Sequence, residues 1–270
     1  MAGVRRKRWD GPPLPVTDLL GLYRELRNAP QKDRVVQAET FAGTPADLAR
    51  LFDHSVEVFS AYENPEAFYP NNHEPRAPLA SGEAIVHGRD VGRALTVADA
   101  DDPFFKVEGI NDLELRLVDY EVEPTRTTGG ARFADGKKAT QGMTLDLLMC
   151  DRAGVPAVCE VKTRGDMDPF FALVQALACT AHLATAPQTD RLRRWFPDLR
   201  FGDGRFDVLV IGVKPAVARP ARYQARFRAA AIQIAEELVE YDAIRQHICH
   251  LAVIDLTQTG SSVLLAKAAS

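Results

Sequence analysis

The sequence lacks the signature motifs of several common enzyme classes. No GxSxG nucleophile elbow, HExxH zinc motif, Walker phosphate loop or GxGxxG dinucleotide-binding pattern occurs in its 270 residues. These absences argue against serine hydrolases of the GxSxG type, HExxH metalloproteases, P-loop enzymes and dinucleotide-binding enzymes. The closest histidine pair, His247 and His250, spans an expected helix end and strand start, so we interpret it as structural.

Long apolar runs and paired cysteines are also missing. No run of 18 apolar residues occurs, so no membrane-spanning helix and no membrane partner are predicted. The start, MAGVRRKRWDGPPLPV, is basic but has no apolar segment behind it, so we do not expect it to act as a secretory signal. The four cysteines include no CxxC pair, which is typical of reduced thiols. These features predict a cytoplasmic protein.

The pattern of apolar residues predicts an α/β protein with two regions. Residues 1–105 are expected to form a basic arm and a mostly helical extension, and residues 106–270 a core. The expected helices cover residues 16–28, a segment that begins at Pro45, and about 90–97, 169–185 and 220–246. The expected strands are 113–123, 145–150, 155–161, 206–213 and 249–256. The first three strands resemble a meander, and the later ones follow helices. This order predicts a mixed β-sheet flanked by helices.

The segment LDLLMCDRAGVPAVCEVKTRGDMDP, residues 145–169, places charged residues inside apolar strands. Its turn, DRAGV, suits a three-residue hairpin loop that is closed by Gly154 in the left-handed conformation. This turn pairs Asp151 with Val155 and therefore sets Asp146 opposite Glu160. Opposed residues share a face of the sheet and have Cβ atoms roughly 4.5–5.5 Å apart. Lys162, two residues beyond Glu160, should project from the same face.

Two carboxylates at this spacing repel each other. At 4 Å and an effective dielectric constant of 20, the repulsion is about 4 kcal/mol. A bound Mg²⁺ or Mn²⁺ would offset it, because these ions prefer carboxylate oxygens. Lys162 could then position a water molecule, so the set predicts a site for metal-assisted hydrolysis. The alternative is a cross-strand salt bridge between Lys162 and Asp146 or Glu160.

The order strand, turn, strand and helix, with Asp146, Glu160-Val161-Lys162 and Gln175, resembles the PD-(D/E)xK nuclease superfamily. The resemblance covers about residues 106–215 and implies a restriction-endonuclease-like fold. It also implies that Asp146, Glu160 and the Val161 carbonyl bind Mg²⁺ or Mn²⁺ and that Lys162 activates water. Gln175 matches the glutamine that some branches place beside the lysine, although a simple surface hydrogen bond is an equal alternative. The family often adds a glutamate from the first core helix, for which Glu57 is the first choice and Glu39 the second. Leu145 stands where the named motif has proline.

The net charge of −4 does not favour binding of nucleic acid by the chain as a whole, so local clusters of basic residues must provide the positive charge for binding. We predict nucleic-acid contacts from Arg191, Arg193, Arg194 and Arg222. Trp195 and Tyr223 could stack on bases. The N-terminus of the helix after Lys162 should also favour phosphate. The alternative is that these arginines lie on solvated helix faces and are balanced by acidic residues.

Together these features predict a metal-dependent nuclease that hydrolyses phosphodiester bonds, with DNA as the expected substrate. The sequence leaves RNA open as a substrate and does not define the mode of cleavage. The alternative is a nucleic-acid-binding or assembly module that has the same fold but cleaves nothing. By analogy with small nucleases that cut both strands, we expect a homodimer. Residues 1–105 could read the substrate, form the dimer or bind a regulatory partner.

Overall fold

The computed structural model describes residues 16–61, 85, 88–95, 104–110, 113–122, 124, 143–163, 168–201, 203–213, 223–259 and 263–268. The strands of these segments form one mixed sheet in the order β1 to β7, and β1 also pairs with β7. Their bounds are β1 Phe105–Glu108, β2 Glu114–Val122, β3 Leu145–Asp151, β4 Pro156–Lys162, β5 Phe206–Val213, β6 Ile248–Thr259 and β7 Val263–Ala268.

The directions of the strands follow from their connections. Strands β2, β3 and β4 are antiparallel neighbours, as expected of a meander. Strand β5 lies parallel to both β4 and β6, because helices connect these strands across the sheet. Strands β6 and β7 are again antiparallel. The predicted mixed sheet between helices is therefore confirmed.

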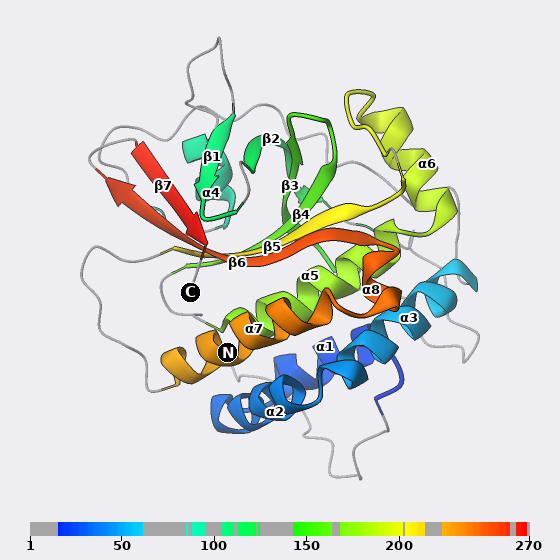
Figure 1. Cartoon of the computed structure of the whole chain (residues 1–270), viewed down its shortest axis with the longest axis vertical. Helices are drawn as coiled ribbons and strands as arrows, with labels where there is room; N and C mark the ends of the chain where they lie inside the picture. The colour runs from blue at the N-terminus through cyan, green and yellow to red at the C-terminus, as the bar shows by residue number, and fades with distance from the viewer. Residues whose placement is uncertain are drawn as a thin grey trace, which may run out of the picture.

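Helices cover one face of the sheet in two layers (Figure 1). Helices α5 and α7 lie directly below the sheet, and α1, α2 and α3 lie below them, whereas α4 lies on the opposite face. The bounds are α1 Leu19–Asn28, α2 Gln31–Gly43, α3 Pro45–Ala61, α4 Gly88–Leu95, α5 Pro169–Leu183, α6 Ala186–Trp195, α7 Gln224–Leu238 and α8 Asp242–Arg245.

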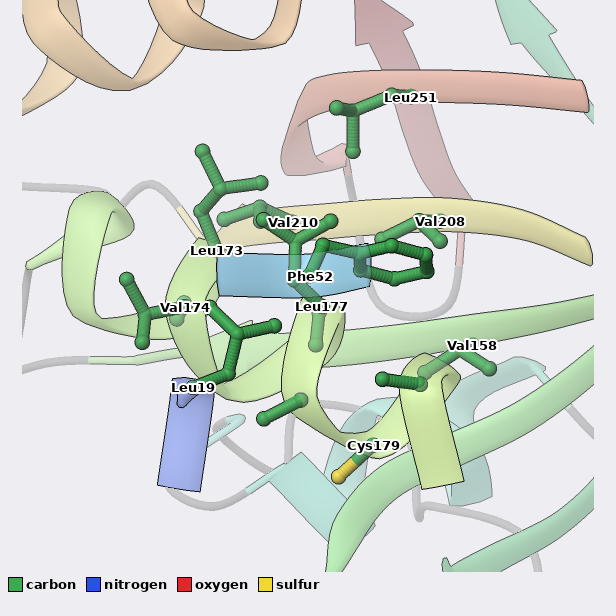
Figure 2. Packing of buried hydrophobic residues seen from close by; sticks show 14 of the residues in the cluster. Leu19, Phe52, Val158, Leu173, Val174, Leu177, Cys179, Val208, Val210 and Leu251 are labelled. Atoms are coloured by element: carbon green, nitrogen blue, oxygen red, sulfur yellow. The ribbon is translucent and has the colours of Figure 1, made fainter. Parts of the chain in front are cut away.

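Helix α5 is the centre of the main hydrophobic core. Every residue from Pro169 to Leu183 is buried except Gln175. A helix that is apolar on all sides is stable only when it is covered on all sides. The sheet covers one side, with Val158 and Val208 among the contacts, and Leu19 and Phe52 from α1 and α3 cover another (Figure 2). Asp168 begins the helix, since its Oδ1 accepts from the backbone N–H of Phe171 (3.0 Å).

The N-terminal helices are part of the same hydrophobic core as the sheet. The predicted division after residue 105 falls within β1, directly after its first residue, Phe105. The main cluster nevertheless includes Leu22, Val35 and Phe52 together with residues of β3, β5 and α7. The backbone N–H of Leu19 also donates to Ser55 Oγ (2.8 Å), which joins α1 to α3. The N-terminal helical region therefore supports the sheet from below.

Several predicted elements required correction. The helix expected over residues 220–246 is wrong in its length, because α7 ends at Leu238 and a turn separates it from the short α8. Helices α2 and α6 and the strands β1 and β7 were not predicted. The other expected elements are present, with ends that differ by a few residues.

Among the described helices, none is long and apolar enough to cross a membrane alone. Only α5 and α6 together pass that test, and an 89° bend separates them.

Candidate active site

The hairpin of β3 and β4 has the predicted register. The N–H of Asp151 donates to the carbonyl of Val155 (3.0 Å), and Gly154 adopts a φ of 88°, as the turn requires. Leu147 lies opposite Cys159, and Leu148 lies opposite Val158. One residue further along, this register sets Asp146 level with Glu160, as predicted. Both acids lie at the end of the hairpin that is remote from the turn.

Glu160 is the most deeply buried charged residue of this group. Its side chain is 0 % exposed, and neither carboxylate oxygen makes a hydrogen bond of normal geometry within the described residues, although a side-chain hydrogen bond with Asp146 contributes to its raised pKa. Burial raises the pKa of Glu160 well above its usual range, the charge of Asp146 raises it further, and Lys162 opposes these effects. Glu160 therefore lies where an ionised carboxylate is unfavourable, and the neighbour that contributes a side-chain hydrogen bond to its pKa is itself an acid.

Asp146 is anchored by the backbone of the neighbouring strand. Its Oδ2 accepts from the N–H of Val161 (2.8 Å). Burial raises the pKa of Asp146, while the hydrogen bond from Val161 and the charge of Lys162 lower it. On the other side, Gly88 begins α4 directly against this carboxyl group: a Cβ at Gly88 would lie 3.1 Å from Asp146 Cγ. Contact with α4 therefore fixes Asp146 from a second direction.

Lys162 is held near both acids without direct ion pairing. Its Nζ lies 5.1 Å from the centre of the Phe171 ring, close enough for a cation–π interaction. Its charge lowers the pKa of both Asp146 and Glu160. The described residues show no salt bridge between Lys162 and either acid. The alternative of a simple cross-strand salt bridge is therefore not what this structure contains, and the ammonium group stays near the site on Phe171.

Gln175 connects α5 to the beginning of β3. Its Nε2 donates to the carbonyl of Thr144 (2.9 Å), two residues before Asp146. It is half-buried and is the only residue of α5 that is not fully buried. The structure therefore places Gln175 next to the strand that carries Asp146, and its hydrogen bond is made to that strand.

Two residues of the N-terminal helices reach the site, although no local sequence pattern indicates that either of them would lie there. Tyr23 of α1 stacks on Phe171 with ring centres 5.1 Å apart, and the charge of Glu160 contributes to raising the pKa of Tyr23, after burial. Arg34 of α2 places its Cζ 5.6 Å from the Phe171 ring, and its Nη1 lies 3.0 Å from Asp168 Oδ2. Helices α1 and α2 thus form one wall beside Lys162.

The beginning of α5 differs from the prediction that it would favour phosphate. Asp168 already accepts the N–H of Phe171 and is paired with Arg34. A second anion at this helix end would therefore meet an existing carboxylate. This part of the prediction is not supported, because the helix terminus is capped by the protein itself.

The structure does not bring the predicted first-helix glutamates to the site. Glu57 is exposed on α3, where its Oε2 lies 3.4 Å from His54 Nδ1. Glu39 is exposed on α2 and forms two hydrogen bonds of 2.6 Å with Arg226 of α7. Neither residue contributes to the pKa of Asp146 or Glu160. The helix that does contact Asp146 is α4, which begins at Gly88.

The predicted nucleic-acid contacts on α6 lie in the segment that packs against the turn end of the hairpin and not at the end that carries the two acids. Arg191 is 4 % exposed, so its guanidinium is not available on the surface. Arg193 pairs with Asp190 (3.0 Å), Arg194 is exposed, and Arg222 lies outside the described residues. The segment after α6 is attached to the hairpin turn, where the N–H of Arg200 donates to the carbonyl of Gly154 (2.7 Å). That turn is about 16 Å along β3 from Asp146.

The donor set fits a magnesium ion that retains several water ligands. Within the described segments, no group of three or more His, Cys, Asp or Glu side chains is gathered in a metal-binding arrangement. Two carboxylates and the Val161 carbonyl are nevertheless oxygen donors of the kind that Mg²⁺ and Mn²⁺ prefer. The two unsatisfied oxygens of Glu160 are the observation that favours a cation here.

Comparison with known proteins adds no assignment. No family model, no curated protein and no solved structure matches the chain.

Proposed function

We propose that this protein is a Mg²⁺-dependent nuclease with a restriction-endonuclease-like core, and that DNA is its substrate. The proposal depends on one observation above all. Glu160 is completely buried beside Asp146, its carboxylate oxygens make no hydrogen bond of normal geometry within the described residues, and burial and the charge of Asp146 both raise its pKa. A fold loses stability by keeping such a pair, so a ligand that compensates both charges is the simplest reason for it. The hairpin followed by a crossover helix to a parallel strand supports the proposed core.

Asp146, Glu160 and the Val161 carbonyl would hold the metal ion. When bound, a divalent ion supplies a more acidic water molecule and stabilises negative charge on the phosphoryl oxygens. The hydrogen bond from Val161 N–H orients Asp146, and Gln175 fixes the backbone just before it. Glu160, enclosed by the core, keeps its carboxylate in one place. These contacts would fix the positions of the oxygens before substrate arrives.

Lys162 would position the attacking water. Phe171 holds its ammonium group through a cation–π contact, and Tyr23 stacks on the same ring, so the lysine has a rigid support. The water oxygen would lose a proton to solvent and form the new bond to phosphorus, the ester P–O bond on the opposite side would break, and the departing oxygen would take a proton from solvent. The ammonium group remains charged and orients the nucleophile throughout.

The test is cleavage of a panel of DNA and RNA substrates with Mg²⁺, Mn²⁺ or EDTA. The matched pair of variants is Lys162→Ala and Lys32→Ala, since Lys32 is an exposed lysine on α2. We expect metal-dependent cleavage that falls by about 10²-fold or more in Lys162→Ala. Cleavage by Lys32→Ala should equal that of the wild type.

A binding or assembly module predicts a different pattern. Folded wild-type protein would then cleave no substrate with either metal, and Asp146→Asn would bind nucleic acid as well as the wild type does. That result would overturn the nuclease proposal. Preference for RNA over DNA in the same panel would correct the substrate but retain the mechanism.

A further inference from the structure

A third acidic residue lies in register with the two predicted ligands. On β2, Tyr120 pairs with Leu147 and Val122 pairs with Leu145, so Glu121 is level with Asp146 on β3. Asp146 is in turn level with Glu160 on β4. Adjacent strands of a sheet lie about 4.8 Å apart. Three carboxylic acids therefore stand side by side on three neighbouring strands.

These three acids form a gradient of burial. Glu160 is fully enclosed, whereas Asp146 and Glu121 are each partly exposed. The charge of Glu121 contributes to raising the pKa of Asp146, which shows that the two groups are electrostatically close. The row thus has one fully enclosed acid, Glu160, and two partly exposed acids, Asp146 and Glu121. A substrate or a hydrated ion would reach the row at the two partly exposed acids.

The backbone at Glu121 is unusual in the same place. Its φ is 51°, and it is the only described residue other than glycine with a positive φ. A one-residue irregularity between Leu117 and Asp119 shifts the pairing of β2 with β3 just before it. Without that shift, the pairing would set Tyr120, and not Glu121, level with Asp146. The irregularity therefore decides which residue of β2 stands beside the acids.

We infer that Glu121 is a third acidic residue of the metal site and that it holds the ion through metal-bound water. The inference rests on the proposed function. We infer contact through water and not direct ligation, because no three acidic side chains are gathered closely enough within the described residues to hold a metal directly. Mg²⁺ keeps several of its waters in protein sites, so an acid one water layer away still contributes to binding. A separate observation also favours a cation beside these three acids: neither carboxylate oxygen of Glu160 makes a hydrogen bond of normal geometry within the described residues.

The experiment measures Mn²⁺ binding to the full chain by electron paramagnetic resonance, with no substrate present. The variants are Glu121→Gln, Asp146→Asn and the control Glu114→Gln, whose carboxylate is on the same strand but pairs with Arg152. Loss of a carboxylate that contacts an ion through water should weaken Mn²⁺ binding by about 10- to 100-fold. Glu114→Gln should bind as the wild type does. Cleavage by Glu121→Gln should recover as the Mg²⁺ concentration is raised.

The possible failures can be told apart. Wild-type binding that is lost in Asp146→Asn but is within twofold of normal in Glu121→Gln would overturn the role of Glu121 and leave the metal site intact. Wild-type protein that neither binds Mn²⁺ nor cleaves nucleic acid would overturn the proposed function itself. If Glu121→Gln fails to fold, Glu121→Asn provides the same test, because asparagine tolerates a positive φ well.

Discussion

Two buried carboxylates on neighbouring strands, Glu160 and Asp207, are compensated in different ways. Burial is the largest cause of a raised pKa for both. Asp207 has a partner within the chain, because His250 Nδ1 lies 2.8 Å from its Oδ1. Glu160 makes no hydrogen bond of normal geometry within the described residues, and the charge that contributes most to its pKa is that of another acid, Asp146. Asp207 therefore has a basic partner for one of its oxygens within the chain, although its Oδ2 has none, whereas for Glu160 the proposed cation would be the compensating partner.

The largest expected effect comes from removing each charge in turn. Glu160→Gln should abolish cleavage, with a loss of at least about 10²-fold, because an oxygen ligand and its charge disappear. The same variant should raise the free energy of unfolding in EDTA by about 1–3 kcal/mol, since an uncompensated buried charge is removed. Asp207→Asn should retain cleavage and lower the free energy of unfolding. Cleavage assays and urea titrations of both variants would measure this contrast.

The opposite stability pattern would break the comparison. If Glu160→Gln were destabilising in EDTA and Asp207→Asn were neutral, Glu160 would be a structural residue. The assignment of a cation to the acidic row would then lose its main support.

A smaller effect is expected from added Mg²⁺ without substrate. An ion that binds only the folded state at 100 times its Kd stabilises that state by about 2.7 kcal/mol. For a chain of this size, the Tm should rise by about 5–10 °C. Asp207→Asn should show the same rise and Glu160→Gln should show almost none. Equal rises in all three proteins, measured by differential scanning calorimetry, would place the ion elsewhere.

The smallest effect is the pH dependence of the Asp207–His250 pair. The hydrogen bond to Asp207 raises the pKa of His250. The stability that protonated His250 contributes is therefore fully present below its unfolded pKa of about 6.5 and is lost as the pH rises through the folded pKa. The pKa of Asp207 is raised by burial, so its contribution also falls with rising pH above its unfolded pKa of about 3.9.

Urea unfolding at pH 6 and pH 8.5 measures this dependence. Between pH 6 and pH 8.5, the free energy of unfolding should fall further in the wild type than in His250→Gln. The difference should be less than about 1 kcal/mol, because His250 is half-exposed and screened by solvent. His54→Gln, which changes an exposed histidine on α3, is the matched control and should behave as the wild type does. A pH dependence that is unchanged in His250→Gln would show that the pair does not compensate Asp207 as described.

The parts of the fold that the sequence predicted correctly depend on local signals. The turn with Gly154 determined the register of Asp146 and Glu160, and the helix expected over residues 169–185 matches α5 to within two residues. Helix α6 was missed because its buried face consists mainly of polar residues, including Gln188 and Arg191, so that apolar periodicity is weak. The long helix expected from residue 220 was wrong because the apolar pattern continues across the turn after Leu238.

The parts of the site that were missed depend on contacts between distant segments. Tyr23 and Arg34 approach Phe171 only because α1 and α2 pack near α5, and no motif in either helix indicates this. Glu121 was missed because the irregularity before Asp119 changes the face of β2 that meets Asp146. The predicted glutamate, Glu57, followed from a family habit and not from a residue pattern, and α3 carries it on an exposed face.

The burial of α5 between the sheet and the early helices has a consequence for biosynthesis. Helices α1 and α3 leave the ribosome long before α5 is made, yet α5 supplies the apolar surface that they cover. Contacts between such distant segments form late and slow folding. The apolar faces of α1 and α3 therefore stay uncovered until α5 has been synthesised. The wall that Tyr23 and Arg34 form beside Lys162 is completed only after α5 has packed against these helices. A nascent chain that ends before α5 would therefore expose the apolar faces of α1 and α3 to solvent.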